Sequence, residues 1–256
     1  MFIDTHTHLY LEDFKNDIDE VMKRAVTAGV DKFFLPNIDS TSVEVMHDIC
    51  KKFPTQCFPM MGVHPCSIKE NYREELNIAH NLLKKNKYYA VGEIGIDLYW
   101  EKSTLPQQVI AFEEQIQWAL DMNLPIVIHC RDAFDEIYEV LARAKKLPKG
   151  IFHCFTGNLE QANKIIDLGG FKLGIGGVVT FKNSGLDKTL EGVDLKHIVL
   201  ETDAPYLTPT PYRGQRNESS YVRIIANRLA EVKNCNVGLV AEITTKNAVE
   251  IFGETA

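Results

Sequence analysis

Residues 125–146, PIVIHCRDAFDEIYEVLARAKK, contain the pattern that decides the fold. The stretch opens with a short apolar run, residues 125–130, that is rich in β-branched side chains and typical of a buried strand. Residues 132–146 then carry apolar side chains at helical spacing on one face: Phe134, Ile137, Tyr138 and Leu141. We therefore predict one strand followed directly by one amphipathic helix.

The same alternation of strand and helix repeats along the chain. Eight short apolar runs are predicted strands, at residues 2–6, 32–37, 57–65, 88–97, 125–130, 150–155, 171–177 and 197–205. Helices are predicted between them, for example at residues 16–29, and two more follow the eighth strand, at residues 220–232 and 239–253. The 256 residues shared among eight such units give about 32 each, close to what a closed barrel requires.

The expected fold is therefore α/β, a single (β/α)8 TIM barrel that spans residues 1–256. An open, doubly wound sheet is the alternative. Such a sheet normally has a glycine-rich phosphate loop after its first strand, and residues 4–14 contain no glycine. In a barrel we expect the site at the carboxyl ends of the strands.

Composition narrows the class of protein. The chain has 28 Lys and Arg against 35 Asp and Glu, which gives a formal net charge of −7. A protein that holds nucleic acid by broad phosphate neutralisation is basic, so any polyanion must be attracted locally here. The six cysteines form no CxxC pair and are expected to be reduced thiols in a cytoplasmic protein. We expect no leader segment and no membrane partner, because no stretch reaches the roughly 20 apolar residues that cross a bilayer.

Histidines and acidic residues gather at the predicted carboxyl ends of the strands. They are His6, His8, His64, Glu93, Asp97, His129, His153, Glu201 and Asp203. One such histidine alone is more often a hydrogen-bonded structural residue than a ligand. Several imidazoles and carboxylates in one apolar-walled cavity need a cation, so together they predict a divalent metal site, with two ions favoured over one. The histidines elsewhere are expected to be structural: His47, His80 and His197.

Seven motifs in order along the chain carry most of these residues. They are FIDTHTHL (2–9), GVHP (62–65), VGEIGIDLYW (91–100), PIVIHCRDAFDE (125–136), FHCFTG (152–157), LETDAPYL (200–207) and YRGQRNESSYV (212–222). Together they resemble the motifs of the TatD family of metal-dependent deoxyribonucleases, within the amidohydrolase-like superfamily. The resemblance runs nearly end to end. It implies a TIM barrel whose two-metal site hydrolyses phosphodiester bonds in DNA, often from a 3′ end.

The resemblance also implies a set of metal ligands. By matched motif these are His6, His8 and Asp203 for one ion, His129 and His153 for the other, and Glu93 as the bridge between them. Imidazole ligands favour Zn or Mn, whereas the resemblance suggests Mg, so the identity of the two divalent cations stays open. Two such ions and two carboxylates leave a local charge of about +2, which would attract phosphate. Tyr10 and Ser219 differ from many relatives, at positions that are not ligands.

For the reaction, we expect Asp203 and Glu93 to be the catalytic residues, with Asp203 orienting or deprotonating the attacking water. His64 is expected to contact the substrate phosphate or the leaving group; its alternative role is a hydrogen bond at the turn that follows. Arg131 follows His129 by two residues and is expected on the same side, and its planar guanidinium suits a phosphate group.

The loop after the eighth strand carries further candidates for substrate binding, at a place where barrels often bind phosphate: Arg213, Arg216 and Asn217. The alternative is a solvated loop tied by ion pairs. Aromatic side chains near the mouth could stack on bases or pack the rim: Tyr99, Trp100, Phe155 and Tyr206. The expected substrate is single-stranded DNA or a DNA end, digested from 3′ to 5′, and no obligate protein partner is evident.

Other functions stay open. An amidohydrolase or phosphotriesterase-like enzyme would keep the barrel and act on small esters or amides. Such enzymes often bridge their metals with a carbamylated lysine on the fourth strand, where this chain has Glu93. A D-aminoacyl-tRNA deacylase would also hydrolyse a bond at the end of a nucleic acid. A barrel that had become a non-enzymatic interaction module would be expected to lose a ligand, and all six are present.

Overall fold

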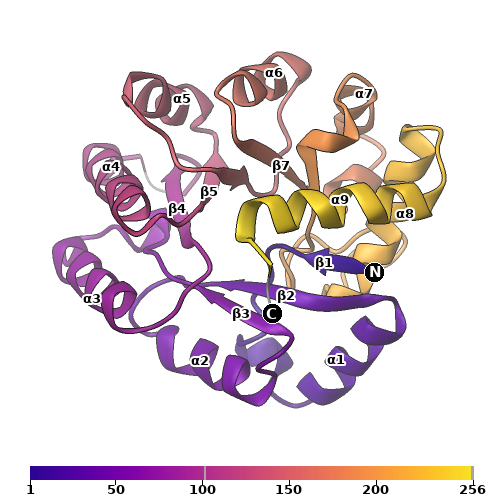
Figure 1. The fold of residues 1–256 in the computed structure, drawn as a ribbon, viewed down its shortest axis with the longest axis horizontal. Coiled ribbons are helices and arrows are strands. Elements are labelled where there is room, and N and C mark those ends of the chain that lie inside the picture. Colours follow the sequence, from indigo (N-terminus) through magenta and orange to yellow (C-terminus); the bar gives the residue numbers. More distant parts are fainter. Residues whose placement is uncertain (101, 255–256) are drawn as a thin grey trace.

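The computed structural model describes residues 1–100 and 102–254, and it contains the eight predicted strands (Figure 1). They are β1 (Phe2–Asp4), β2 (Val30–Pro36), β3 (Cys57–Met60), β4 (Val91–Asp97), β5 (Ile126–Arg131), β6 (Gly150–Phe152), β7 (Phe171–Ile175) and β8 (Ile198–Leu200). All of the pairings between neighbouring strands are parallel. The predicted α/β architecture is therefore confirmed.

Helices surround the strands (Figure 1). Their bounds are α1 (Ile18–Thr27), α2 (Val43–Lys52), α3 (Tyr72–Lys85), α4 (Leu105–Met122), α5 (Phe134–Arg143), α6 (Leu159–Asp167), α7 (Leu186–Glu191), α8 (Val222–Val232) and α9 (Val237–Phe252). None of the helices within the described residues combines the length and the apolar character that crossing a bilayer requires.

The strands follow one another around a barrel in chain order. Hydrogen bonds link β1, β2 and β3 into one sheet, and β4 to β8 into another. Between β3 and β4, the Met61 N–H donates to Ala90 O at 3.1 Å, and the Gly92 N–H donates to Met61 O at 3.1 Å. Between β8 and β1, the Thr5 N–H donates to Leu200 O at 3.0 Å. These bonds join the two sheets at both edges, as the TIM barrel requires.

Alternate strand residues point inward, and α9 covers one end of the barrel. An inner cluster combines strand residues with the last turn of α9: Ile3, Phe34, Val127, Ile151, Val199, Ile251 and Phe252. The rings of Phe34 and Phe252 stack with their centroids 3.7 Å apart. Residues of the opposite strand faces pack against the surrounding helices in a larger cluster, the outer core. The amino ends of the strands are thus closed, and the carboxyl ends form the mouth.

The polar residues lie one layer above the inner cluster. Residues two apart in a strand share a face, so the side chains that follow Val127, Ile151 and Val199 by two positions also point inward. These are His129, His153 and Glu201. The apolar layer therefore forms a floor beneath the mouth.

An irregularity in β4 turns Glu93 inward. Val91, Ile94 and Ile96 all belong to the outer core, although Val91 and Ile94 lie an odd number of residues apart. The pairing of β4 with β5 shifts register between these two residues. Since Ile94 and Ile96 point outward, strand alternation directs Glu93 and Asp97 into the barrel.

Most of the strands end earlier than predicted, and for β1 and β8 the difference bears on the site. β1 ends at residue 4 instead of 6, and β8 ends at residue 200 instead of 205. The segments that follow bond to each other: the His8 N–H donates to Ala204 O at 2.8 Å, and the Asp203 N–H donates to His6 O at 2.9 Å. His6, His8 and Asp203 therefore lie on the segments that continue β1 and β8, and backbone hydrogen bonds hold these two segments together.

Candidate metal centre

Glu93 lies at the centre of the histidines, and its two carboxylate oxygens face different pairs. Oε2 lies 3.1 Å from Nε2 of His6 and 3.8 Å from Nε2 of His8. Oε1 lies 2.7 Å from Nδ1 of His129 and 2.7 Å from Nε2 of His153. The side chain is only 2% exposed. One buried carboxylate therefore divides four histidines into two pairs.

Asp203 completes the pair on the Oε2 side of Glu93. Its Oδ1 lies 3.4 Å from Nε2 of His8 and 3.6 Å from Nε2 of His6. The side-chain donors of these three residues lie within 4.8 Å of one another and could hold a metal ion. The same holds for His6, Glu93 and His153.

Tyr10 determines which nitrogen of His8 faces Asp203. The Tyr10 hydroxyl donates its hydrogen to Pro36 O at 2.5 Å, and its oxygen lies 2.9 Å from Nδ1 of His8. Because that hydroxyl has only one hydrogen, it must accept from Nδ1 of the histidine. A neutral His8 then presents the lone pair of Nε2 to Asp203. Tyr10 thus orients a candidate ligand two residues before it.

Asp97 has the corresponding role for His129. Its Oδ2 lies 2.9 Å from Nε2 of His129. An ionised carboxylate can only accept a hydrogen bond, so the hydrogen of a neutral His129 resides on Nε2 and the lone pair of Nδ1 faces Glu93. Although burial opposes it, the hydrogen bond from His129 helps to lower the pKa of Asp97 to about 2, so this carboxylate is ionised near neutral pH.

His64 lies beside the candidate metal-ligand cluster, the group formed by His6, His8, Glu93, His129, His153 and Asp203. Unlike His8 and His129, it turns its protonated ring nitrogen toward this group. The Cys66 N–H donates to Nδ1 of His64 at 3.0 Å, so a neutral ring carries its hydrogen on Nε2. That nitrogen lies 3.4 Å from Oε1 of Glu93 and 3.3 Å from Nδ1 of His129. Position alone would let these three residues hold an ion. A protonated Nε2 cannot be a ligand, however, so we interpret His64 as a hydrogen-bond donor at the edge of the centre.

Glu201 supports His153 from the side away from Glu93. It is fully buried, accepts a hydrogen bond from the Cys154 N–H, and places Oε1 3.6 Å from Nδ1 of His153. A Cβ atom at Gly174 would overlap its carboxylate, so the glycine provides the space. Glu201 therefore anchors the loop after β6 and keeps Nε2 of His153 turned to the centre.

Unpartnered nitrogens show that the residues fit a metal. His6 and His153 stack with ring centroids 3.9 Å apart, and both nitrogens of His6 and Nδ1 of His153 are buried without a hydrogen bond in the described chain. A buried polar atom without a partner costs about 1–3 kcal/mol, and a metal would offset this cost at Nε2 of His6, the nitrogen that faces Glu93 and Asp203. Imidazole nitrogens together with carboxylate oxygens are a donor set that divalent ions such as Zn and Mn accept.

The electrostatics of the cluster keep its carboxylates ionised. Burial raises the pKa of Glu93, but the surrounding histidines, His153 foremost, lower it well below its ordinary value. The pKa of Asp203 is lowered as well, since the neighbouring histidines, His8 foremost, outweigh burial. In return, Glu93 and Glu201 overcome the effect of burial and raise the pKa of His153 well above 6.5. The cluster therefore favours added positive charge, either protons or metal ions.

The loop after β8 does not present Asn217 or Arg216 to a substrate in this structure, contrary to the expectation. Asn217 is fully buried, and its Nδ2 donates to Thr202 O at 2.8 Å and to Tyr206 O at 2.5 Å. Arg216 donates to both carboxylate oxygens of Asp17, each at 2.7 Å. Both side chains instead hold the loop against the barrel.

The other two arginines predicted to bind phosphate stack on aromatic rings. The guanidinium carbon of Arg213 lies 3.8 Å from the ring centroid of Phe181, and that of Arg131 lies 3.9 Å from the ring centroid of Tyr99. Arg131 follows His129 by two residues at the end of β5, so of the two it is the arginine that adjoins the cluster.

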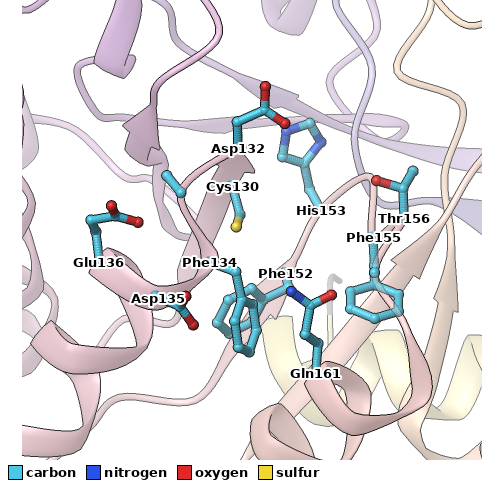
Figure 2. A pocket seen from close by; sticks show the side chains of 12 residues that line it. Cys130, Asp132, Phe134, Asp135, Glu136, Phe152, His153, Phe155, Thr156 and Gln161 are labelled. Carbon is cyan, nitrogen blue, oxygen red and sulfur yellow. The ribbon is translucent and has the colours of Figure 1, made fainter. Parts of the chain in front are cut away.

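A cavity of about 430 Å³ opens beside the cluster, between the loops that follow β5 and β6. Figure 2 shows His153 and Asp132 together at one end of it and the ring of Phe155 on the side of the β6 loop. Asp132, Asp135 and Glu136 make its lining acidic. Phosphate groups are therefore disfavoured inside the cavity.

Asp97 and Tyr10 orient candidate ligands in the structure, but the site predicted from the sequence gives them no role. Asp97 was identified only as a residue at a strand end, and Tyr10 only as a departure from relatives. The available signal was period two: Tyr10 follows His8 by two residues, and Asp97 shares a strand face with Glu93. Their partners on other strands were not predictable from that spacing.

Known proteins resemble the chain over nearly its full length. A family model described as TatD related DNase matches residues 3–253. The uncharacterized metal-dependent hydrolase YabD of Bacillus subtilis (strain 168) is 35% identical over 254 residues, which cover 98% of this chain and 99% of that protein. The 3′-5′ ssDNA/RNA exonuclease TatD of Pantoea ananatis is 31% identical over 257 residues, which cover 98% of each.

Solved structures share the fold. The crystal structure of YJJV, a TatD homolog from Escherichia coli K12, matches with a TM-score of 0.92 and 28% identity, over 98% of this chain and 97% of that one. A TatD family hydrolase from Entamoeba histolytica matches with a TM-score of 0.86 and 21% identity, over 98% of both chains. At that lower identity the second match shows the barrel alone.

Proposed function

The chain belongs to the TatD family of metal-dependent hydrolases, and on this premise we propose that it removes nucleotides from the 3′ end of single-stranded DNA by metal-dependent hydrolysis. One observation carries the proposal: the two oxygens of Glu93 face two separate pairs of histidines. Two adjacent cation positions that share a carboxylate suit the in-line displacement at a phosphodiester. The name of the Pantoea ananatis relative supports this choice of substrate.

In this proposal six residues hold two divalent cations, Mg, Zn or Mn. The ligands are His6, His8 and Asp203 for the first ion, His129 and His153 for the second, and Glu93 between them. Divalent cations bound there would supply Lewis acidity toward a phosphoryl oxygen and lower the pKa of water. With two carboxylates and neutral histidines, the loaded centre carries about +2, so it attracts phosphate on a protein of net charge −7.

The chain's own residues divide the remaining work. Asp203 is the more exposed of the two central carboxylates, 15% against 2% for Glu93, and it is ionised, so it can accept a proton from the attacking water. His64 directs the N–H of Nε2 toward the centre and would donate a hydrogen bond to a phosphoryl or leaving-group oxygen. Arg131 would hold a neighbouring phosphate.

The free thiols support a proposal for the cellular location. All six cysteines are free, which agrees with a reducing compartment, so we keep the cytoplasm as the proposed location. No protein partner is required by this mechanism.

Metal analysis and digestion of labelled DNA test the function. The purified protein, loaded in turn with Mg, Mn and Zn, is expected to shorten a 5′-labelled single strand progressively and to release the label at once from a 3′-labelled strand. Asp203→Asn should abolish this activity and leave the fold intact by circular dichroism. Asp132→Asn, an exposed carboxylate of the same mouth, is the matched control and should retain activity.

A panel of small lactams, phosphotriesters and D-aminoacyl-tRNA separates the alternatives. Hydrolysis of any of these by a metal-loaded protein that leaves oligonucleotides intact would overturn the proposed nuclease and leave the hydrolase family assignment in place.

A further inference from the structure

Two aromatic side chains stand exposed beside the metal centre. Tyr99 is 54% exposed and Trp100 is 68% exposed, directly after the end of β4. Their rings meet edge to face at 4.9 Å between centroids. Large apolar surface left in water is costly unless a ligand covers it, so this pair suggests a binding surface.

Arg131 turns the pair into a three-residue platform. Its guanidinium carbon lies 3.9 Å from the ring centroid of Tyr99 and 5.5 Å from that of Trp100. The residue itself is exposed at the end of β5. The platform therefore offers flat π faces and a positive charge at one point of the rim.

Asp97 ties the platform to the metal centre. Its Oδ1 accepts hydrogen bonds from the Tyr99 N–H at 2.9 Å and from the Trp100 N–H at 3.1 Å. Its Oδ2 lies 2.9 Å from Nε2 of His129. A single carboxylate thus positions both a candidate ligand and the backbone of the two exposed rings.

A third exposed ring lies on the other side of Glu93. Tyr206 is 53% exposed, and its ring centroid lies 6.2 Å from that of His8. His8 faces Oε2 of Glu93 and His129 faces Oε1. The exposed aromatic rings therefore flank the cluster at both ends.

We propose that Tyr99, Trp100 and Arg131 bind an unpaired nucleobase next to the phosphate that is hydrolysed, and that Tyr206 contacts the base on the other side. Every nucleobase has a flat face, so such stacking tolerates any sequence. In a duplex those faces are covered by neighbouring bases, so the platform selects single strands. This inference rests on the proposed function, because it takes the base to be part of a DNA substrate. The binding of a nucleotide by the platform can be tested separately.

Tryptophan fluorescence reports binding without any hydrolysis. The chain has two tryptophans, and the second, Trp118, is 4% exposed and stacks on His80. Deoxyadenosine 5′-monophosphate added to the metal-loaded protein should quench the emission in a saturable manner, and 2-deoxyribose 5-phosphate should not. The response should vanish in Trp100→Leu. Equal quenching by both ligands, or none by the nucleotide, would overturn the platform.

Hydrolysis of strands with and without bases gives the second readout. Trp100→Leu should lower kcat/KM on a single-stranded oligonucleotide roughly 5- to 150-fold, the range for the loss of one base–aromatic stack, and should leave an abasic strand of equal length unaffected. Arg131→Leu should weaken binding of both strands, because it removes a phosphate contact, and should weaken the strand with bases more, because it also removes one side of the platform. The matched controls are Leu239→Ala, an exposed apolar residue of α9, and Arg143→Leu, an exposed arginine of α5.

The two readouts separate this inference from the proposed function. Equal cleavage of normal and abasic strands by the unaltered protein would overturn the platform and keep the nuclease. Nucleotide-specific quenching by a protein that cuts no DNA would support the platform and overturn the nuclease.

Discussion

Nε2 of His129 lies 2.9 Å from Oδ2 of Asp97, while the other ring nitrogen lies 2.7 Å from Glu93. The carboxylate thereby fixes which nitrogen is available to a metal. In Asp97→Asn, the amide oxygen can still accept the Tyr99 and Trp100 N–H groups, but the amide NH2 then faces His129 and favours the wrong tautomer. We expect metal affinity to fall about 10- to 100-fold, measured by competition with a chelator. Unchanged affinity would remove Asp97 from the site; Asp132→Asn is the control.

Glu93→Gln should release both ions together. The amide has lost the charge that the four histidines share, and its NH2 group cannot be a ligand. Metal analysis after dialysis is expected to give less than one ion per chain, with DNA hydrolysis abolished. A variant that still retained two ions would contradict the bridging position of Glu93.

His6→Ala should weaken the binding of one metal ion more than the binding of the other. His6 faces Oε2 of Glu93 and Asp203, on the opposite side of the carboxylate from His129. Titration of the metal-free variant is expected to show one site near its original affinity and one weakened site. Equal weakening of both sites would show that Glu93 couples them. His197→Ala, at the amino end of β8, should bind as the unaltered protein does.

His64→Asn separates a hydrogen-bond donor from a ligand. The asparagine side chain can still accept from the Cys66 N–H through its amide oxygen, but it is shorter and has no donor at the position of Nε2. We expect kcat to fall on the order of 100-fold, with metal content unchanged. Loss of an ion in this variant would instead make His64 a metal ligand.

Metal binding should weaken as the pH falls, starting above the ordinary histidine value. Burial lowers the pKa of His129 and His153, but hydrogen bonds and nearby carboxylates outweigh it and raise both above 6.5. Protons and metal ions compete for the same nitrogens, so affinity is highest at a pH above the raised pKa values and falls as pH drops through them. Calorimetric titrations between pH 8 and pH 6, about the histidine range, measure this. A flat profile would contradict the competition.

The barrel was predictable because each strand–helix unit has a recognisable local sequence pattern. A short β-branched run followed by an amphipathic helix is enough to identify a strand and its helix, as residues 125–146 illustrate. The cluster was predictable for a related reason, since parallel strands bring their carboxyl ends to one mouth. His6, Glu93, His153 and Asp203 thus meet although they are distant in sequence.

The orientation of the ligands was not predictable in the same way. The hydroxyl of Tyr10 acts on His8 only because the carbonyl of Pro36, on β2, takes its hydrogen. Likewise, Arg216 is occupied by Asp17, 199 residues away along the chain. Such partners depend on the path that the loops take between the strands. The periodic pattern of apolar residues in the sequence does not predict that path.

The position of α9 has a practical consequence for immobilising the protein in binding measurements. Gly253 and Glu254 lie beside Lys87 and Lys149, which precede β4 and β6, on the side of the barrel opposite the mouth. A linker attached after these residues would leave from the sealed end. Protein immobilised on a sensor surface through such a linker would therefore turn the candidate metal centre toward the solution, where a strand of the proposed substrate could enter without meeting the support.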